Sequence, residues 1–91
     1  MKAYVITDPE KFKEAATMMK WRAEKMKAES FAKVWSAQTR KGDENANRMS
    51  ARIEVGRTAQ LFQQIGDKRS LIGTMWVTSA REFVQGMEEV K

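Results

Sequence analysis

The chain has 91 residues, 42% of them apolar and 32% charged, a composition typical of one small folded domain rather than a disordered segment. It contains neither cysteine nor histidine, which excludes disulfides, cysteine-bound metals and the commonest general base. The formal net charge is +5: residues 1–42 carry ten Lys or Arg against five Asp or Glu, whereas residues 43–91 carry seven of each. A basic first half predicts an anionic partner, with a solvated lysine-rich face as the alternative.

The sequence has no apolar run near the roughly 18 residues that a membrane-spanning helix needs. Its first residues are too soon followed by Asp8 and Pro9 to form a secretory signal. We therefore expect no membrane partner and, by default, a cytoplasmic location.

Residues 1–7 are expected to form an N-terminal arm, because Ala3–Ile6 is strand-like but no second strand-like run offers it a partner. Asp8 and Pro9 then indicate a helix start, with an N-cap residue followed by proline at the first helical position. Arg40 and Lys41 followed by Gly42 indicate the helix end. The sequence therefore predicts one long helix over residues 8–41.

This predicted helix carries apolar residues on two opposite sides. At about 100° per residue, one stripe is formed by Phe12, Ala15, Ala16, Met19, Ala23, Met26, Ser30 and Val34. A second stripe lies roughly 160° away and consists of Trp21, Ala28, Phe31 and Trp35. A surface helix needs only one apolar stripe, so the second predicts a subunit interface or a ligand-facing side.

The second half of the chain also shows apolar residues at helical spacing, which predicts a second arm over residues 43–65 and 67–90. Asp43 is a plausible cap for the start of this arm. Gly66 and Asp67 either separate two helices or kink one. The predicted fold class is therefore all-α, a single helical domain over residues 1–91 built as a long antiparallel hairpin, with three helices if the second arm is broken at Gly66.

No motif for catalysis or metal binding is present. The glycines form no phosphate loop, no serine lies in a GxSxG elbow, and neither HExxH nor an acidic calcium loop occurs. We therefore predict a binding protein that is not an enzyme, with no catalytic residue, cofactor or metal.

The segment Lys20–Lys27 is the most informative local cluster, because basic residues flank Trp21 there, with Phe31 and Trp35 further along the same face. Aromatic faces can stack on bases while nearby cations neutralise phosphates. Alternatively, the aromatic rings are buried in a subunit interface, with Lys and Arg stems over its rim. Arg48 and Arg52, one helical turn apart in the predicted second arm, could grip a phosphate together or form part of a solvated face.

The segment Gly73-Thr74-Met75-Trp76-Val77-Thr78-Ser79-Ala80 resembles a pattern in the small phage anti-CBASS sponge proteins, and Ala23-Glu24 followed by Phe31 is similar to their first long helix. This resemblance implies a helical oligomer that sequesters a cyclic oligonucleotide without cleaving it, in the host cytoplasm if the protein is phage-encoded. It also implies ligand contacts from an early tyrosine and from a lysine in the first long helix, by position Tyr4 and Lys20.

The function predicted from these features is sequestration of an anionic ligand such as a cyclic nucleotide by a basic homo-oligomer; the alternative is a nucleic-acid-binding or protein-adaptor accessory protein. The candidate ligand-binding residues are Tyr4, Lys20, Arg22, Lys27, Arg48 and Arg52. The candidate interface residues are Trp21, Phe31, Trp35, Met75 and Trp76.

Overall fold

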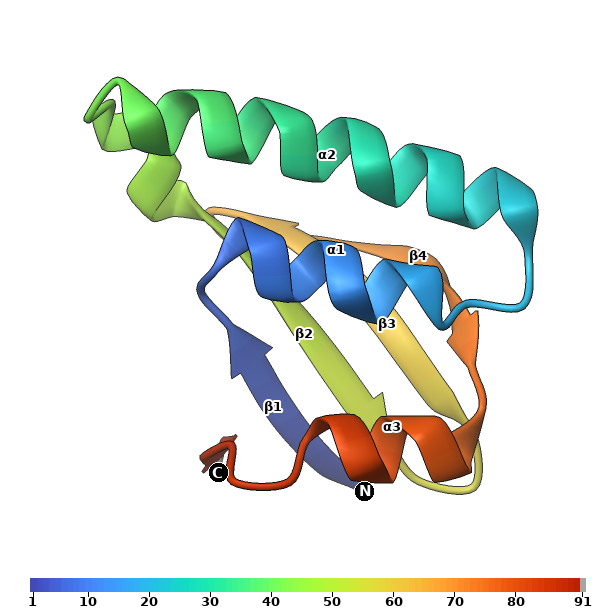
Figure 1. The fold of residues 1–91 in the computed structure, drawn as a ribbon. Coiled ribbons are helices and arrows are strands. Elements are labelled where there is room, and N and C mark those ends of the chain that lie inside the picture. The colour runs from blue at the N-terminus through green and yellow to red at the C-terminus, as the bar shows by residue number, and fades with distance from the viewer. Residues whose placement is uncertain (91) are drawn as a thin grey trace.

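The structure is a computed structural model that describes residues 1–90, and it shows an antiparallel five-stranded sheet with α1 and α2 lying over one face (Figure 1). The strand order is β4-β3-β2-β1-β5. In chain order the elements are β1 (Lys2–Ile6), α1 (Pro9–Thr17), α2 (Arg22–Arg40), the 3₁₀ helix η1 (Glu44–Arg48), β2 (Met49–Val55), β3 (Ala59–Ile65), β4 (Lys68–Met75), α3 (Val77–Phe83) and β5 (Glu89–Val90). The predicted all-α class and helical hairpin are therefore wrong.

The second predicted arm is wrong because its apolar residues follow a period of two. In β2 the four apolar residues Met49, Ala51, Ile53 and Val55 are buried, and the polar residues between them face the other side of the sheet. Met49 and Ile53 are four positions apart, a spacing that fits one helical turn as well as alternate strand positions. The burial of Ala51 and Val55 distinguishes the two, since a helix would turn these residues away from that face.

Two short turns connect the three long strands. Gly66 and Asp67 join β3 to β4 as a two-residue hairpin loop, with φ of +59° at Gly66, a conformation that glycine adopts without strain. Residues 56–58 join β2 to β3. The predicted helix break at Gly66 is thus a strand reversal, and residues 67–90 contain only one short helix, α3.

The predicted N-terminal arm is instead a strand inside the sheet. β1 pairs with β2 along its whole length, from Lys2 opposite Val55 to Ile6 opposite Ala51, and with β5 on its other side. The partner strand was missed because residues 49–55 were interpreted as helix.

The helix predicted over residues 8–41 is two helices, α1 and α2, joined by residues 18–21. A single helix of that length would extend about 50 Å, which exceeds the 37 Å longest dimension of the protein. The joining segment crosses the end of β4, where Met19 pairs with Met75 and the Lys20 amide donates to the Thr74 carbonyl at 3.3 Å. Breaking the helix here allows both halves to cover the sheet.

Local helix signals are confirmed at three positions. The Asp8 carboxylate accepts a hydrogen bond from the Glu10 amide at 3.0 Å and caps α1, with Pro9 as its first residue. α2 ends at Arg40, followed by Gly42 at φ +68°. Asp43 also caps a helix, but a 3₁₀ helix of five residues rather than a long α-helix.

The helix break explains the two apolar stripes. Phe12, Ala15, Ala16 and Met19 point into the core from α1 and the segment after it, and Ala28, Phe31, Ala32 and Trp35 point into the same core from α2. The remainder of the first stripe lies on the outer side of α2, where Met26 and Val34 are 60% and 51% exposed. The buried parts of the two stripes therefore converge on one core, whereas Trp21 and the α2 part of the first stripe stay exposed.

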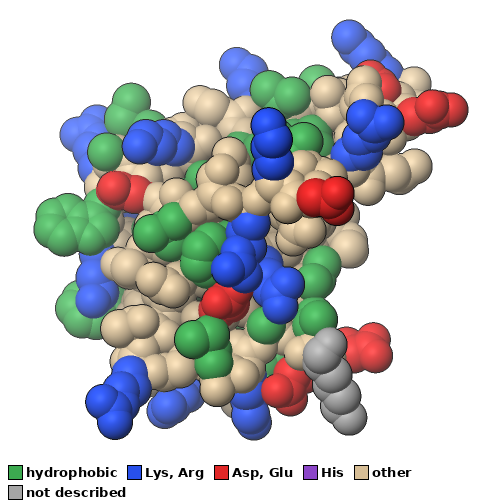
Figure 2. Space-filling view, turned by 180° about the vertical axis from the view of Figure 1, so that it is seen from behind, with side chains coloured by type: hydrophobic (Ala, Val, Ile, Leu, Met, Phe, Trp, Pro, Cys, Tyr) green, Lys and Arg blue, Asp and Glu red, His purple; other side chains and the backbone are tan. Residues whose placement is uncertain are grey.

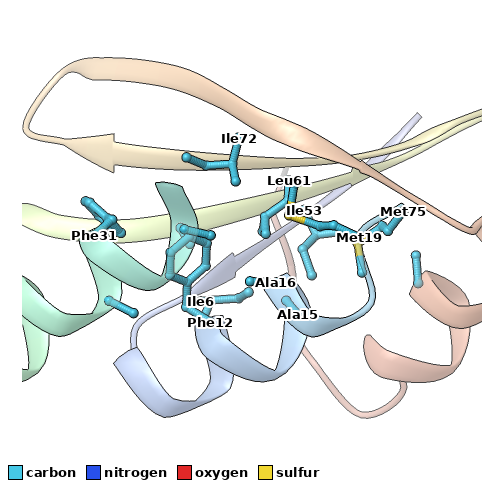
Figure 3. Close-up of a cluster of buried hydrophobic side chains, with 14 of the residues drawn as sticks. Ile6, Phe12, Ala15, Ala16, Met19, Phe31, Ile53, Leu61, Ile72 and Met75 are labelled. Atoms are coloured by element: carbon cyan, nitrogen blue, oxygen red, sulfur yellow. The ribbon is translucent and has the colours of Figure 1, made fainter. Parts of the chain in front are cut away.

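An aromatic cluster forms the centre of this core. Phe12 packs edge-on against Phe31 with ring centroids 5.2 Å apart, and the Trp35 ring lies 5.7 Å from Phe31 and 6.2 Å from Phe12. Ile53 and Leu61 contribute from the sheet, and Figure 3 shows side chains from α1, α2 and the strands meeting here. Three of the predicted interface residues, Phe31, Trp35 and Met75, are at most 7% exposed. They are core residues of this chain rather than interface residues.

We predict that Trp35→Ala lowers the free energy of unfolding by about 3–5 kcal/mol, because it opens a cavity in the aromatic cluster. Trp21→Ala is the matched control: it removes the same side chain from an exposed position and should change stability by less than about 0.5 kcal/mol. Urea unfolding followed by circular dichroism measures both. Equal losses from the two variants would contradict the assignment of Trp35 to the core.

We also predict that Gly73→Ala destabilises the protein by about 1–3 kcal/mol through overpacking. A Cβ at Gly73 would collide with the Met19 side chain and lie 2.8 Å from Glu24 Cβ, which is fixed to the first turn of α2. Gly56→Ala is the control, because its nearest neighbour would be Met1 Cγ at an ordinary 3.7 Å. Thermal unfolding of both variants makes the comparison, and an unchanged Gly73→Ala midpoint would show that α2 does not press on β4.

Candidate functional site

The six predicted ligand-binding residues do not form one site. Lys20 and Arg22 lie where α1 joins α2, and the other four lie on separate surfaces. Tyr4 is half-buried in β1, Lys27 is exposed on α2, Arg48 is exposed on η1, and Arg52 is half-buried in β2.

Lys20 lies between two exposed tryptophans: Trp21 follows it in the chain, and Trp76 contacts its ammonium. Trp21 and Trp76 are each 61% exposed, and the Lys20 ammonium lies 3.8 Å from the centroid of the Trp76 ring, a cation–π contact. We call Lys20, Trp21, Arg22, Lys25 and Trp76 the tryptophan corner. A large aromatic side chain is normally buried, so two exposed together indicate a binding surface.

The fold places these residues together because the segment joining α1 to α2 pairs with the end of β4. Met19 and Met75 are paired and both point into the core, so the residue that follows each of them faces outward. Trp21 and Trp76 are the residues immediately before α2 and α3, and both have extended backbone. Neither tryptophan belongs to a helix, so both indole rings project from the ends of elements rather than from a packed face.

The tryptophan corner is predominantly basic. A hollow of about 590 Å³ beside it is lined by three cations, one methionine and one carboxylate: Lys20, Arg22, Lys25, Met26 and Glu29. None of the three cations takes part in an ion pair with another residue between 1 and 90. Figure 2, a view from behind, shows exposed hydrophobic side chains with Lys and Arg beside them along its left edge. The corner therefore offers aromatic surface and uncompensated positive charge side by side.

Arg52 lies on the sheet face that the helices leave open, and its charge is compensated there. Glu54 Oε2 lies 3.4 Å from Arg52 Nε and also accepts a hydrogen bond from Arg69. The Arg69 guanidinium lies over the Phe62 ring, 4.6 Å from its centroid. The helical spacing predicted for Arg48 and Arg52 is wrong, because Arg48 belongs to η1 and Arg52 to β2. Phosphate binding by these two residues stays a prediction.

Sequence reasoning found Lys20, Trp21 and Arg22 through their adjacency, and it assigned Trp76 to an interface. It did not connect Trp76 with Lys20, because only strand pairing brings the two together. The segment that carried the family resemblance, residues 73–80, spans the end of β4 and the start of α3 rather than one helix.

Comparison with protein-family models, with curated proteins and with solved structures finds no match to this chain. Among the described residues there is no group of three or more acidic side chains that could hold a metal ion, and no helix that is long and apolar enough to cross a membrane.

We predict that Glu54→Gln destabilises the protein by about 1 kcal/mol, because Arg52 and Arg69 lose the carboxylate they share. The loss should shrink at high salt, which screens the ion pairs of the wild-type protein. Glu14→Gln, at an exposed position of α1, provides the control and should be neutral. Urea unfolding at low and high salt tests this, and a salt-independent loss would point to packing rather than charge.

Proposed function

We propose that this protein binds an oligonucleotide with unpaired bases through the tryptophan corner. The observation that carries the proposal is the placement of Lys20 over the Trp76 ring, next to the equally exposed Trp21. Stacking of a base on an aromatic side chain contributes about 1–3 kcal/mol and tolerates any base. Lysine and arginine beside the rings neutralise the phosphodiesters that connect the bases.

The arrangement favours unpaired bases over a duplex. In a double helix the base faces are stacked on one another, so an indole ring has no free face to contact. The two tryptophans lie at the ends of helices rather than on a helix that could enter a groove. Each ring can accept one base, and Lys20, Arg22 and Lys25, which line the hollow beside the rings, would neutralise the phosphates.

Two ligands share this chemistry: a linear single strand and a cyclic oligonucleotide. Both present bases joined by phosphodiesters, so the tryptophan corner suits either of them. The proposal concerns binding alone, and direct titration shows which of the two ligands the protein prefers.

The test is a titration of the protein with a fluorescently labelled single-stranded hexanucleotide, with cyclic di- and trinucleotides, and with a duplex of the same sequence. We expect the duplex to bind more weakly than the single strand or the cyclic ligand. Trp21→Ala and Trp76→Ala should each weaken binding of the preferred ligand by about 5- to 150-fold, the equivalent of one lost stacking contact. Trp21→Phe and Trp76→Phe keep an aromatic face and should lose less.

The salt dependence of the same titration tests the role of the cations. Lys20→Gln should reduce the slope of log affinity against log salt by about 0.7 for a single strand, because one phosphate contact is removed. Lys41→Gln, exposed beyond the far end of α2, is the matched control and should leave the slope unchanged.

The proposal fails if no nucleotide ligand binds, if the duplex binds as well as the single strand, or if the alanine variants keep wild-type affinity. Anionic lipid vesicles serve as a further control, because tryptophan and lysine together also occur at membrane interfaces. Binding to vesicles but to no oligonucleotide would overturn the proposal.

A further inference from the structure

A second basic feature lies at the opposite end of α3 from Trp76. The start of β1, the turn between β2 and β3 and the last part of α3 surround a pocket of about 580 Å³. The first strand, this turn and α3 lie together at the lower edge of Figure 1. The pocket is lined by Met1, Lys2, Tyr4, Val55, Gly56, Arg57, Arg81 and Val84. Its volume falls within the roughly 300–1,000 Å³ of sites that hold small molecules.

Three cations line this pocket and no carboxylate does. Lys2, Arg57 and Arg81 are all exposed, and none of them forms an ion pair with another residue of the described chain, 1–90. Bringing like charges together is unfavourable unless an anion lies between them. The arrangement therefore fits an anionic ligand better than a simple solvated surface, on which acidic and basic residues alternate.

The three cations converge because three separate elements meet here. Lys2 lies opposite Val55 in the pairing of β1 with β2, and Arg57 follows in the turn after β2. Arg81 is held by α3, whose buried Ala80 has no exposed surface and belongs to the main core. Each cation therefore belongs to a different element, and their presence around one pocket is a property of the fold rather than of a local charge run.

The rest of the lining can hold the uncharged part of a ligand. Among the lining residues, Val55 and Val84 are buried and apolar, and Tyr4 is half-buried. Phosphate-binding sites commonly combine arginines, which bind phosphate oxygens in pairs, with such an apolar or aromatic surface.

We propose that this pocket binds a small molecule with a terminal phosphate or diphosphate, such as a nucleoside diphosphate. Lys2, Arg57 and Arg81 bind the phosphate oxygens, and Tyr4 with Val55 and Val84 contacts the uncharged part. The site is separate from the tryptophan corner: the corner presents open aromatic faces to bases, whereas the pocket surrounds a compact anion.

The experiment is isothermal titration calorimetry of the full chain with ADP, inorganic pyrophosphate and adenosine. We expect ADP and pyrophosphate to bind. Adenosine should bind at least about tenfold more weakly, because it lacks the phosphates. A tenfold change corresponds to about 1.4 kcal/mol of binding free energy, close to the loss of one hydrogen bond between a cation and a phosphate oxygen. Arg57→Gln and Arg81→Gln should each weaken ADP binding about tenfold or more. Arg48→Gln, which removes the same charge from an exposed position on η1, should leave it unchanged.

Amide shift changes in NMR spectra give a second readout and should map to Tyr4, Gly56 and Val84 on addition of ADP. Arg57 is exposed in a turn, so its variant should fold, and thermal unfolding will test this.

Trp21→Ala should leave ADP binding intact, and Arg57→Gln should leave oligonucleotide binding intact. Failure of this proposal is therefore distinguishable from failure of the proposed oligonucleotide binding. The proposal is overturned if neither phosphate ligand binds, if adenosine binds as well as ADP, if Arg48→Gln weakens binding as much as Arg57→Gln, or if the shift changes map elsewhere.

Discussion

The contact between residues 18–21 and the end of β4 is the constraint on which this structure depends. The Lys20 amide bonds to the Thr74 carbonyl, Met19 pairs with Met75, and Gly73 leaves room for Met19 and Glu24 to approach. This contact breaks what would otherwise be one long rod and folds its two halves onto the same sheet. It also turns Lys20, Trp21 and Trp76 outward together, so the architecture of the core and the proposed binding surface have the same origin.

The parts of the fold that were predicted correctly from the sequence are helix ends, which depend on residues adjacent in the chain. Asp8 and Gly42 mark helix ends because capping depends on a few adjacent backbone groups. The strand β2 was missed although residues 49–55 alternate strictly between apolar and polar side chains, which is a strand signal. The spacing of Met49 and Ile53 fits a helix as well, and the helical interpretation was chosen. The break after Thr17 could not be foreseen, because the apolar spacing of α1 continues in phase into the first turns of α2.

The candidate sites likewise combine residues that the sequence shows to be neighbours with residues that only the fold brings together. Lys20, Trp21 and Arg22 are adjacent in the chain, so their basic and aromatic character is visible in the sequence. Trp76 joins them only through strand pairing, and Lys2, Arg57 and Arg81 come from three segments that no local pattern connects. Buried Phe31 and Trp35 show the converse error: aromatic residues at helical spacing were assigned to a neighbouring subunit because the sheet they cover had not been recognised.

The edges of the sheet have a consequence for self-association. Within residues 1–90, β5 comprises Glu89 and Val90, a short stretch of backbone for another strand to join. At the other edge, β4 begins with Lys68 and Arg69, and its Thr74 carbonyl already accepts a hydrogen bond from the Lys20 amide. Short and charged outer strands discourage lateral addition of foreign strands, which is how soluble sheet proteins avoid polymerising into fibrils. Copies of this chain that associate are therefore expected to do so through side chains rather than by growth of a shared sheet.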